Sequence, residues 1–203
     1  MVLDAPAAPG AETDVGAGFS RPVQQSSWGP ALAGPSIAPS GACPTIPNTF
    51  AASNRGPHRY FLTFCTWERA RHFKSADHVS LVCEQFQRAS REQSFAVIAY
   101  CFMPDHVHLL VAGERQEADL KRFSTIAKQY SGFYFQQASG LPLWQRYGFE
   151  RVLRTEEATE IVARYTIANP VRAGLVQSPA DYPFWGSFLY TRDALLEYVQ
   201  RAG

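Results

Sequence analysis

The sequence predicts an α+β fold, a ferredoxin-like sandwich in which helices cover one face of an antiparallel sheet. Two observations support this prediction. Strand-like and helix-like hydrophobic patterns follow one another in the order strand, helix, strand, strand, helix, strand, helix. Two of these strands are separated only by a tight Met-Pro-Asp turn, which favours an antiparallel pair. This order is the split βαβ pattern.

The first 50 residues differ in composition from the rest of the chain. They are dominated by Ala, Pro, Gly and Ser and show no apolar periodicity. Such a segment buries too little apolar surface to offset the entropy of ordering, so we expect residues 1–50 to be a disordered tail. Residues 51–203 are then expected to form one domain. No apolar run reaches membrane-spanning length, and the four cysteines lack metal-finger spacing, which together favour a cytoplasmic protein.

The first half of the domain is assigned from its periodicity. Residues 59–67 (RYFLTFCTW) alternate aromatic and β-branched side chains, as strands do. Residues 77–93 carry an apolar stripe at helical spacing and begin with Asp77, a residue type that caps helices. Residues 94–102 and 106–112 are predicted strands on either side of the Met-Pro-Asp turn.

The second half of the domain is assigned in the same way. Residues 118–139 form a predicted long helix that a following Gly and Pro terminate. Residues 143–154 are predicted to be a loop followed by a strand. Residues 155–168 follow the pattern of a helix with Thr at its N-cap and an Asn-Pro pair at its end. A last helix is expected over residues 193–201.

Two histidines stand one residue apart inside the strand 106–112. Because side chains alternate faces along a strand, His106 and His108 must point the same way. Val107 and the apolar residues that follow hold this strand in a core. Two imidazoles fixed side by side are typical of a metal site. They can also be ordinary surface histidines, because a chain with five histidines contains such a pair by chance fairly often.

Tyr165 and Asn169 are four residues apart on the helix 155–168 and its end, so they share one helical face. A tyrosine can act as a covalent nucleophile once its phenolate is stabilised, and an amide oxygen can bind a metal. The alternative is a core aromatic followed by a helix C-cap. Tyr130 and Tyr134 are rival nucleophiles, but their place in an apolar stripe favours packing roles.

Three segments, MPDHVHLLVA, LPLWQRYGFERVLR and YTIANPVRAGLV, occur in this order. Together they resemble the single-tyrosine HUH transposases, most nearly the REP-associated tyrosine transposases, over roughly residues 58–190. The resemblance implies cleavage and rejoining of single-stranded or hairpin DNA through a 5′-phosphotyrosine intermediate. It implies Tyr165 as the nucleophile, and His106, His108 and Asn169 as ligands of Mg²⁺ or Mn²⁺. Thr166 departs from the family, which often has Ile at that position.

Arginines are frequent after the histidines, although the net charge of the chain is only +1. We expect contacts to DNA from Gln145, Arg146, Arg151 and Arg172. Trp144 and Tyr147 are candidates for stacking on unpaired bases, with a hydrophobic anchor as the alternative role of Trp144. A DNA strand transferase of this kind is expected in the cytoplasm, associated with the nucleoid, and to act as a monomer or a homodimer.

Two other functions remain open at this point. The first is a domesticated, catalytically inactive transposase that only binds DNA hairpins; its catalytic residues would be free to change. The presence of His106, His108, Tyr165 and Asn169 favours the enzyme. The second is an RNA-binding domain of the same fold, which predicts solvent-facing aromatics on the central strands where this chain carries histidines.

Overall fold

The computed structural model describes residues 54–146, 148–153 and 159–200. All of these described residues belong to one compact unit. The expected tail over residues 1–50, the stacking candidate Tyr147 and the expected cap Thr155 lie outside the described residues. None of the helices within those described ranges combines the length and the apolar character needed to cross a membrane.

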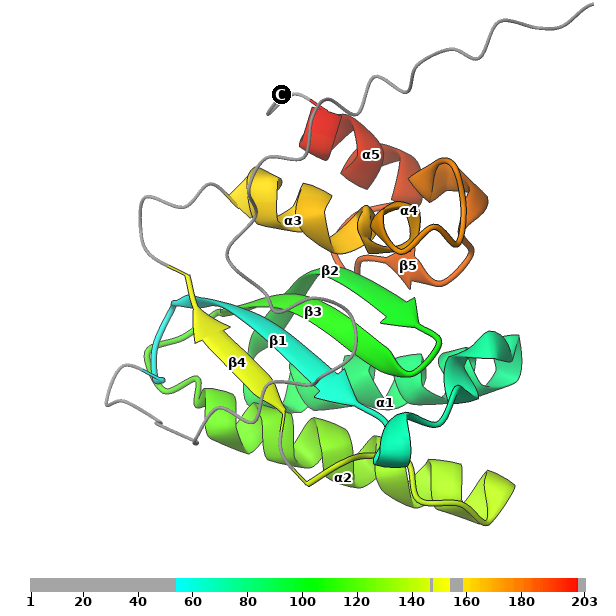
Figure 1. Cartoon of the computed structure of the whole chain (residues 1–203). Helices are drawn as coiled ribbons and strands as arrows, with labels where there is room; N and C mark the ends of the chain where they lie inside the picture. Colours follow the sequence, from blue (N-terminus) through cyan, green and yellow to red (C-terminus); the bar gives the residue numbers. More distant parts are fainter. Residues whose placement is uncertain (1–53, 147, 154–158, 201–203) are drawn as a thin grey trace, which may run out of the picture. The chain divides into compact units, whose positions relative to one another are not determined.

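A five-stranded antiparallel sheet in the order β4-β1-β3-β2-β5 is the centre of this unit (Figure 1). Its strands are β1 (Arg59–Cys65), β2 (Phe95–Met103), β3 (His106–Gly113), β4 (Phe149–Val152) and β5 (Trp185–Gly186). The order of the first four strands is that of a split βαβ fold, so the predicted α+β class is confirmed. β5 escaped the sequence analysis because two residues are too short to show a period-two pattern.

Helices cover both faces of the sheet, which corrects the prediction that they cover one. α1 (Ala76–Gln93) and α2 (Leu120–Ser139) pack on one face, and α3 (Thr159–Ile167) and α5 (Arg192–Gln200) pack on the other (Figure 1). The physical reason lies in β1, which is buried at every position from Tyr60 onward. A strand that is apolar on both sides needs cover on both sides.

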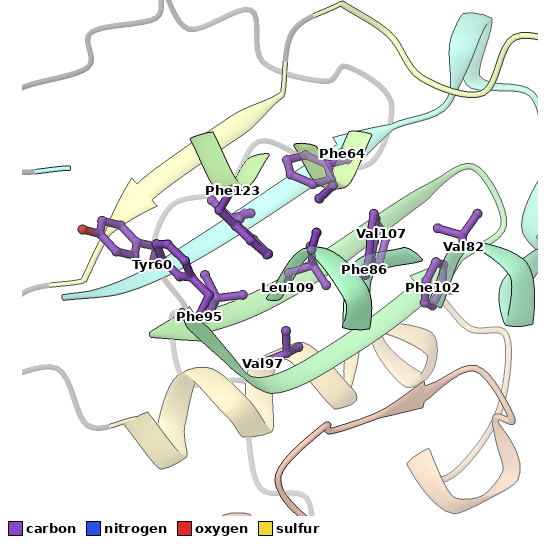
Figure 2. Packing of buried hydrophobic residues seen from close by; sticks show 14 of the residues in the cluster. Tyr60, Phe64, Val82, Phe86, Phe95, Val97, Phe102, Val107, Leu109 and Phe123 are labelled. Atoms are coloured by element: carbon purple, nitrogen blue, oxygen red, sulfur yellow. The ribbon is translucent and has the colours of Figure 1, made fainter. Parts of the chain in front are cut away.

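The core between the sheet and the pair α1 and α2 is rich in aromatic residues. Figure 2 shows Phe64 of β1, Phe86 of α1 and Phe102 of β2 gathered on this side of the sheet. The Phe64 and Phe86 rings meet edge to face with centroids 6.0 Å apart. Burying side chains of this size stabilises a fold by about 1.5–3 kcal/mol each, so this face contributes mainly to stability.

A β-bulge between Val97 and Ala99 changes which residues of β2 face each side. Before the bulge, Phe95 and Val97 belong to the core under α1 and α2. After it, Ala99 and Cys101 belong to the core under α3 and α5. The bulge therefore places the buried Cys101 directly opposite His108 of β3.

The ends of α1 and α2 follow local rules with one difference from expectation. α1 begins at Ala76 after Ser75, so Asp77 lies inside its first turn rather than at the cap. At α2, the Asp119 carboxylate accepts a hydrogen bond from the Arg122 N–H at 3.1 Å. Gly140, with φ of +73°, terminates α2 in the left-handed conformation that glycine adopts most easily.

Candidate active site

The two histidines of β3 face α3 and lie close together. Register pairs His106 with Cys65 and His108 with Thr63 across the β1–β3 ladder. The Nε2 atoms of the two imidazoles are 3.1 Å apart. The prediction that the two histidines share one face of the strand is confirmed. Their two Nε2 atoms are close enough to bind the same ion.

The other nitrogen of each imidazole is held by a polar side chain. Asp105 Oδ1 lies 2.6 Å from His106 Nδ1, and Thr63 Oγ1 lies 2.9 Å from His108 Nδ1. Metal-binding histidines are generally oriented in this way by a carboxylate or another polar group at the distal nitrogen. The donor set around the Nε2 pair therefore fits a metal ion.

The protonation of His108 also suits metal binding. The side chain is only 6% exposed. Burial lowers the pKa of His108 well below its ordinary value, and the charges of His106 and Arg69 lower it further. His108 is therefore neutral near pH 7, the form that binds a metal ion.

Asp105 is held by a second charged group that the sequence analysis missed. Arg69 Nε lies 3.0 Å from Asp105 Oδ2. Burial raises the pKa of Asp105, but the hydrogen bond to His106 and the charges of His106 and Arg69 outweigh it and leave the pKa below its ordinary value. The position of Asp105 directly before His106 was a signal in the sequence, whereas Arg69 gave none because it is 36 positions away from Asp105.

α3 brings Tyr165 to the same side of the sheet as the histidines. The Phe61 ring stacks on His108 with centroids 5.3 Å apart, and it meets Tyr165 edge to face at 6.0 Å. Tyr130 and Tyr134 lie on α2, against the opposite face of the sheet. Only Tyr165 among the three candidate tyrosines thus shares a face with the histidines.

Two arginines act on the phenol of Tyr165. The Arg172 guanidinium lies 4.7 Å from the centre of the Tyr165 ring, and Arg151 of β4 pairs with Phe61. Burial raises the pKa of Tyr165, while the charges of Arg172 and Arg151 act in the opposite direction. The phenol is protonated at neutral pH, and both guanidinium groups are placed to favour its phenolate. Arg151 and Arg172 are thus part of this site.

Asn169 follows the end of α3 at Ile167 and is the first residue of the short helix α4 (Asn169–Arg172). Its Nδ2 donates to the carbonyl oxygens of Tyr165 at 2.9 Å and of Thr166 at 3.1 Å. Pro170 has no N–H to offer the Thr166 carbonyl, so the Asn169 amide takes that role. Asn169 is not itself the C-cap residue, because it begins α4, but its side chain supplies hydrogen bonds to carbonyls at the end of α3, and its Oδ1 remains as the atom able to bind a metal. Whether it does so stays a prediction.

A metal site here needs such an oxygen ligand. The ranges covered by the structure contain no group of three or more His, Cys, Asp or Glu side chains that could hold a metal. A metal ion held by the Nε2 pair would need a further ligand of another type, and an amide oxygen is one that hard divalent ions accept. Thr166, where the family often has Ile, is buried and donates its hydroxyl to the Val162 carbonyl at 2.8 Å, so the substitution leaves no unsatisfied group.

The loop before β4 carries three of the residues expected to contact DNA, Trp144, Gln145 and Arg146. Gln145 donates its N–H to the Cys65 carbonyl at 2.9 Å, which places it at the end of β1 that pairs with His106. The carbonyls of Gln145 and Arg146 both accept from Lys128 Nζ. Trp144 instead packs in the core under α1 and α2, and its indole N–H donates to a serine hydroxyl. The hydrophobic-anchor interpretation of Trp144 is confirmed.

Comparison with known proteins identifies the family of this chain. The family model described as "Transposase IS200 like" matches residues 56–165, a range that contains both histidines and ends at Tyr165. A REP-associated tyrosine transposase of Escherichia coli is 26% identical over 135 residues, which cover 62% of this chain and 78% of that protein. A Haemophilus influenzae protein assigned to the same group is 23% identical over 136 residues, 62% of this chain and 77% of that protein.

The fold is also known from a solved structure. A REP-associated tyrosine transposase bound to a REP hairpin superposes with a TM-score of 0.57 at 20% identity, over 67% of this chain and 80% of that one. This similarity supports the α+β fold described above. The family match covers more than half of the chain and includes His106, His108 and Tyr165. The chain therefore belongs to the family of IS200-like transposases.

Proposed function

We propose that this transposase cleaves and rejoins single-stranded DNA through a covalent 5′-phosphotyrosine at Tyr165. One observation carries the proposal: the face of the sheet under α3 gathers two imidazoles whose Nε2 atoms are 3.1 Å apart and a tyrosine, joined through the ring of Phe61. Similarity to proteins of the REP-associated kind, one of them solved with a REP hairpin, favours a DNA hairpin beside the cleavage site.

Tyr165 supplies the nucleophile. Its phenol loses a proton to solvent, the resulting phenolate oxygen attacks the scissile phosphorus and forms a new P–O bond, and the bond to the 3′-oxygen breaks. That oxygen takes up a proton from solvent and leaves as a 3′-hydroxyl. Arg172 and Arg151 favour the phenolate and neutralise the phosphate that approaches it. In the reverse direction a 3′-hydroxyl attacks the phosphotyrosine, so the strand is rejoined without an external source of energy.

His106, His108 and Asn169 would hold a divalent ion through two imidazole nitrogens and one amide oxygen. When bound, Mg²⁺ or Mn²⁺ polarises the scissile phosphate and offsets negative charge on its oxygens. Imidazoles alone would also suit zinc, but a set completed by amide, phosphate and water oxygens favours a harder ion. Gln145 and Arg146, beyond the end of β1, are proposed to contact the DNA backbone.

The test is to trap the covalent intermediate. Labelled single-stranded DNA from the flanks of the gene is incubated with the full chain and Mn²⁺, and adducts are resolved on a denaturing gel. We expect an adduct that peptide mass spectrometry maps to Tyr165. Tyr165→Phe should bind the DNA and form no adduct, because it keeps the ring and lacks the attacking oxygen.

Tyr130→Phe is the matched control, since Tyr130 lies on α2 across the sheet and should be dispensable for the adduct. An adduct on Tyr130 or Tyr134 would overturn the assigned nucleophile. Tight hairpin binding by the wild-type chain with no adduct under any metal condition would instead establish the inactive, hairpin-binding alternative.

A further inference from the structure

We infer, on the basis of the proposed metal site, that Asp105 and Arg69 are positioning residues that fix the proton of His106 on Nδ1. The Nε2 lone pair of His106 then faces the position of the metal. Asp105 accepts a hydrogen bond from the Nδ1–H of His106 through one carboxylate oxygen, and Arg69 holds the other oxygen of the same carboxylate. The two residues therefore select one imidazole tautomer.

The contacts form a chain of three side chains. Arg69 Nε lies 3.0 Å from Asp105 Oδ2, and Asp105 Oδ1 lies 2.6 Å from His106 Nδ1. A carboxylate can only accept hydrogen bonds, so the proton between Asp105 and His106 belongs to Nδ1. A neutral imidazole with its proton on Nδ1 has its lone pair on Nε2, the nitrogen that lies 3.1 Å from His108.

The neighbouring histidine lacks such a constraint. Thr63 Oγ1 lies 2.9 Å from His108 Nδ1, and a hydroxyl can either donate or accept. Thr63 therefore accommodates both tautomers of His108, including one whose Nε2–H donates to His106. Tautomer selection in this pair depends on the carboxylate beside His106.

The fold accepts backbone strain to place Arg69. Glu68 and Arg69 have φ values of +49° and +57°, in the left-handed region that is unfavourable for residues other than glycine. The turn is held by an Arg69 N–H bond to the Thr66 carbonyl at 3.1 Å and by the Thr66 hydroxyl on the Ala70 carbonyl at 2.8 Å. It directs the Arg69 guanidinium back over the end of β1, onto Cys65 and Asp105. Strain of this kind is typical of functional sites.

Asp105→Asn turns the inference into a measurable change. The Arg69 guanidinium requires an acceptor, so the amide oxygen of the variant faces Arg69 and its NH₂ group faces His106 Nδ1. That nitrogen must then accept, and the proton moves to Nε2. Nitrogen-15 NMR should show His106 protonated on Nδ1 in the wild type and on Nε2 in the variant. Calorimetry should show the Kd for Mn²⁺ rising by about 10–100-fold.

Removing Arg69 should reverse this effect. In the double variant Asp105→Asn with Arg69→Met the amide is free to rotate, and its oxygen can accept from Nδ1 again. We expect its Mn²⁺ affinity to return to that of Arg69→Met alone. Thr63→Val is the matched control, because it alters the partner of His108 and should leave the His106 proton on Nδ1.

Each result decides the question. If NMR shows that His106 of the wild-type chain is protonated on Nε2, the inference is overturned. This measurement uses the wild-type chain alone, so it does not depend on whether a variant folds. Retention of the Nδ1 proton in Asp105→Asn, or failure of Arg69→Met to restore it, also overturns the inference. If the wild-type chain shows the expected tautomer of His106 but binds no Mn²⁺, the proposed metal site is refuted. The roles of Asp105 and Arg69 in fixing the proton would still hold.

Discussion

Substitution of Phe61 tests whether the ring contacts within the site affect activity apart from their effect on the stability of the fold. It is 1% exposed and contacts the rings of both His108 and Tyr165. Phe61→Leu keeps most of the volume and removes both ring contacts. Aromatic contacts contribute about 0.5–1.5 kcal/mol each beyond area burial, so we expect a loss of about 1–3 kcal/mol in the free energy of unfolding.

Phe64 provides a matched control on the same strand. It is also 1% exposed, but it faces the opposite core, where it meets Phe86 and Trp144 edge to face, both at 6.0 Å. Phe64→Leu should therefore destabilise the fold by a similar amount without touching the site. Urea unfolding measures the stability of both variants.

The rate of covalent adduct formation then separates the two variants. Where both are folded, Phe61→Leu should slow the adduct by about tenfold or more, since a 1.4 kcal/mol rise in barrier is a factor of ten. Phe64→Leu should retain the wild-type rate. Equal slowing in the two variants would show that Phe61 acts only through general stability, and would refute its assigned link between His108 and Tyr165.

Three further predictions follow from single contacts. His106→Ala should abolish Mn²⁺ binding in calorimetry. It should change Tm little, because the side chain is half-buried and its hydrogen-bond partners are Asp105 and His108. An unchanged affinity for Mn²⁺ would refute the role of His106 as a ligand. Asn169→Ala should lower the free energy of unfolding by about 1–2 kcal/mol in urea titrations, since two carbonyls at the end of α3 lose their donor. Burial, with a contribution from the charge of Asp119, raises the pKa of Tyr60 to about 12. The folded state thus favours the neutral phenol, and this stabilisation is complete below pH 10 and lost as the pH rises from 10 to 12, by about 1.4 kcal/mol per pH unit. A urea midpoint that stays constant from pH 9 to 11 would contradict it.

The sequence predicted the histidine pair because strand parity is a local property. A spacing of two on a strand places His106 and His108 on one face whatever the rest of the chain does. A spacing of four likewise predicted that Tyr165 and Asn169 lie one turn apart, and the Asn169 amide does reach the Tyr165 carbonyl. The order of the main strands and helices was available for the same reason.

Other parts of the site depend on long-range register and could not be found this way. Thr63 reaches His108 only because β1 and β3 pair in one particular register. Arg69 reaches Asp105 through a turn with two non-glycine residues at positive φ, for which no residue pattern exists. The cover on the second sheet face was missed because α3 and α5 show their apolar sides only once the sheet beneath them is known.

Because β3 lies in the middle of the sheet, its unfolding determines when the two histidines lose their fixed spacing. β3 pairs with β1 along one edge and with β2 along the other, from His106 to beyond Val111. Backbone amides in such a strand exchange with solvent only when the whole sheet comes apart, whereas helix ends and loops open locally. The spacing of the two imidazoles should therefore persist until global unfolding, and slow deuterium uptake at Val107 and Leu109 would report an intact pair.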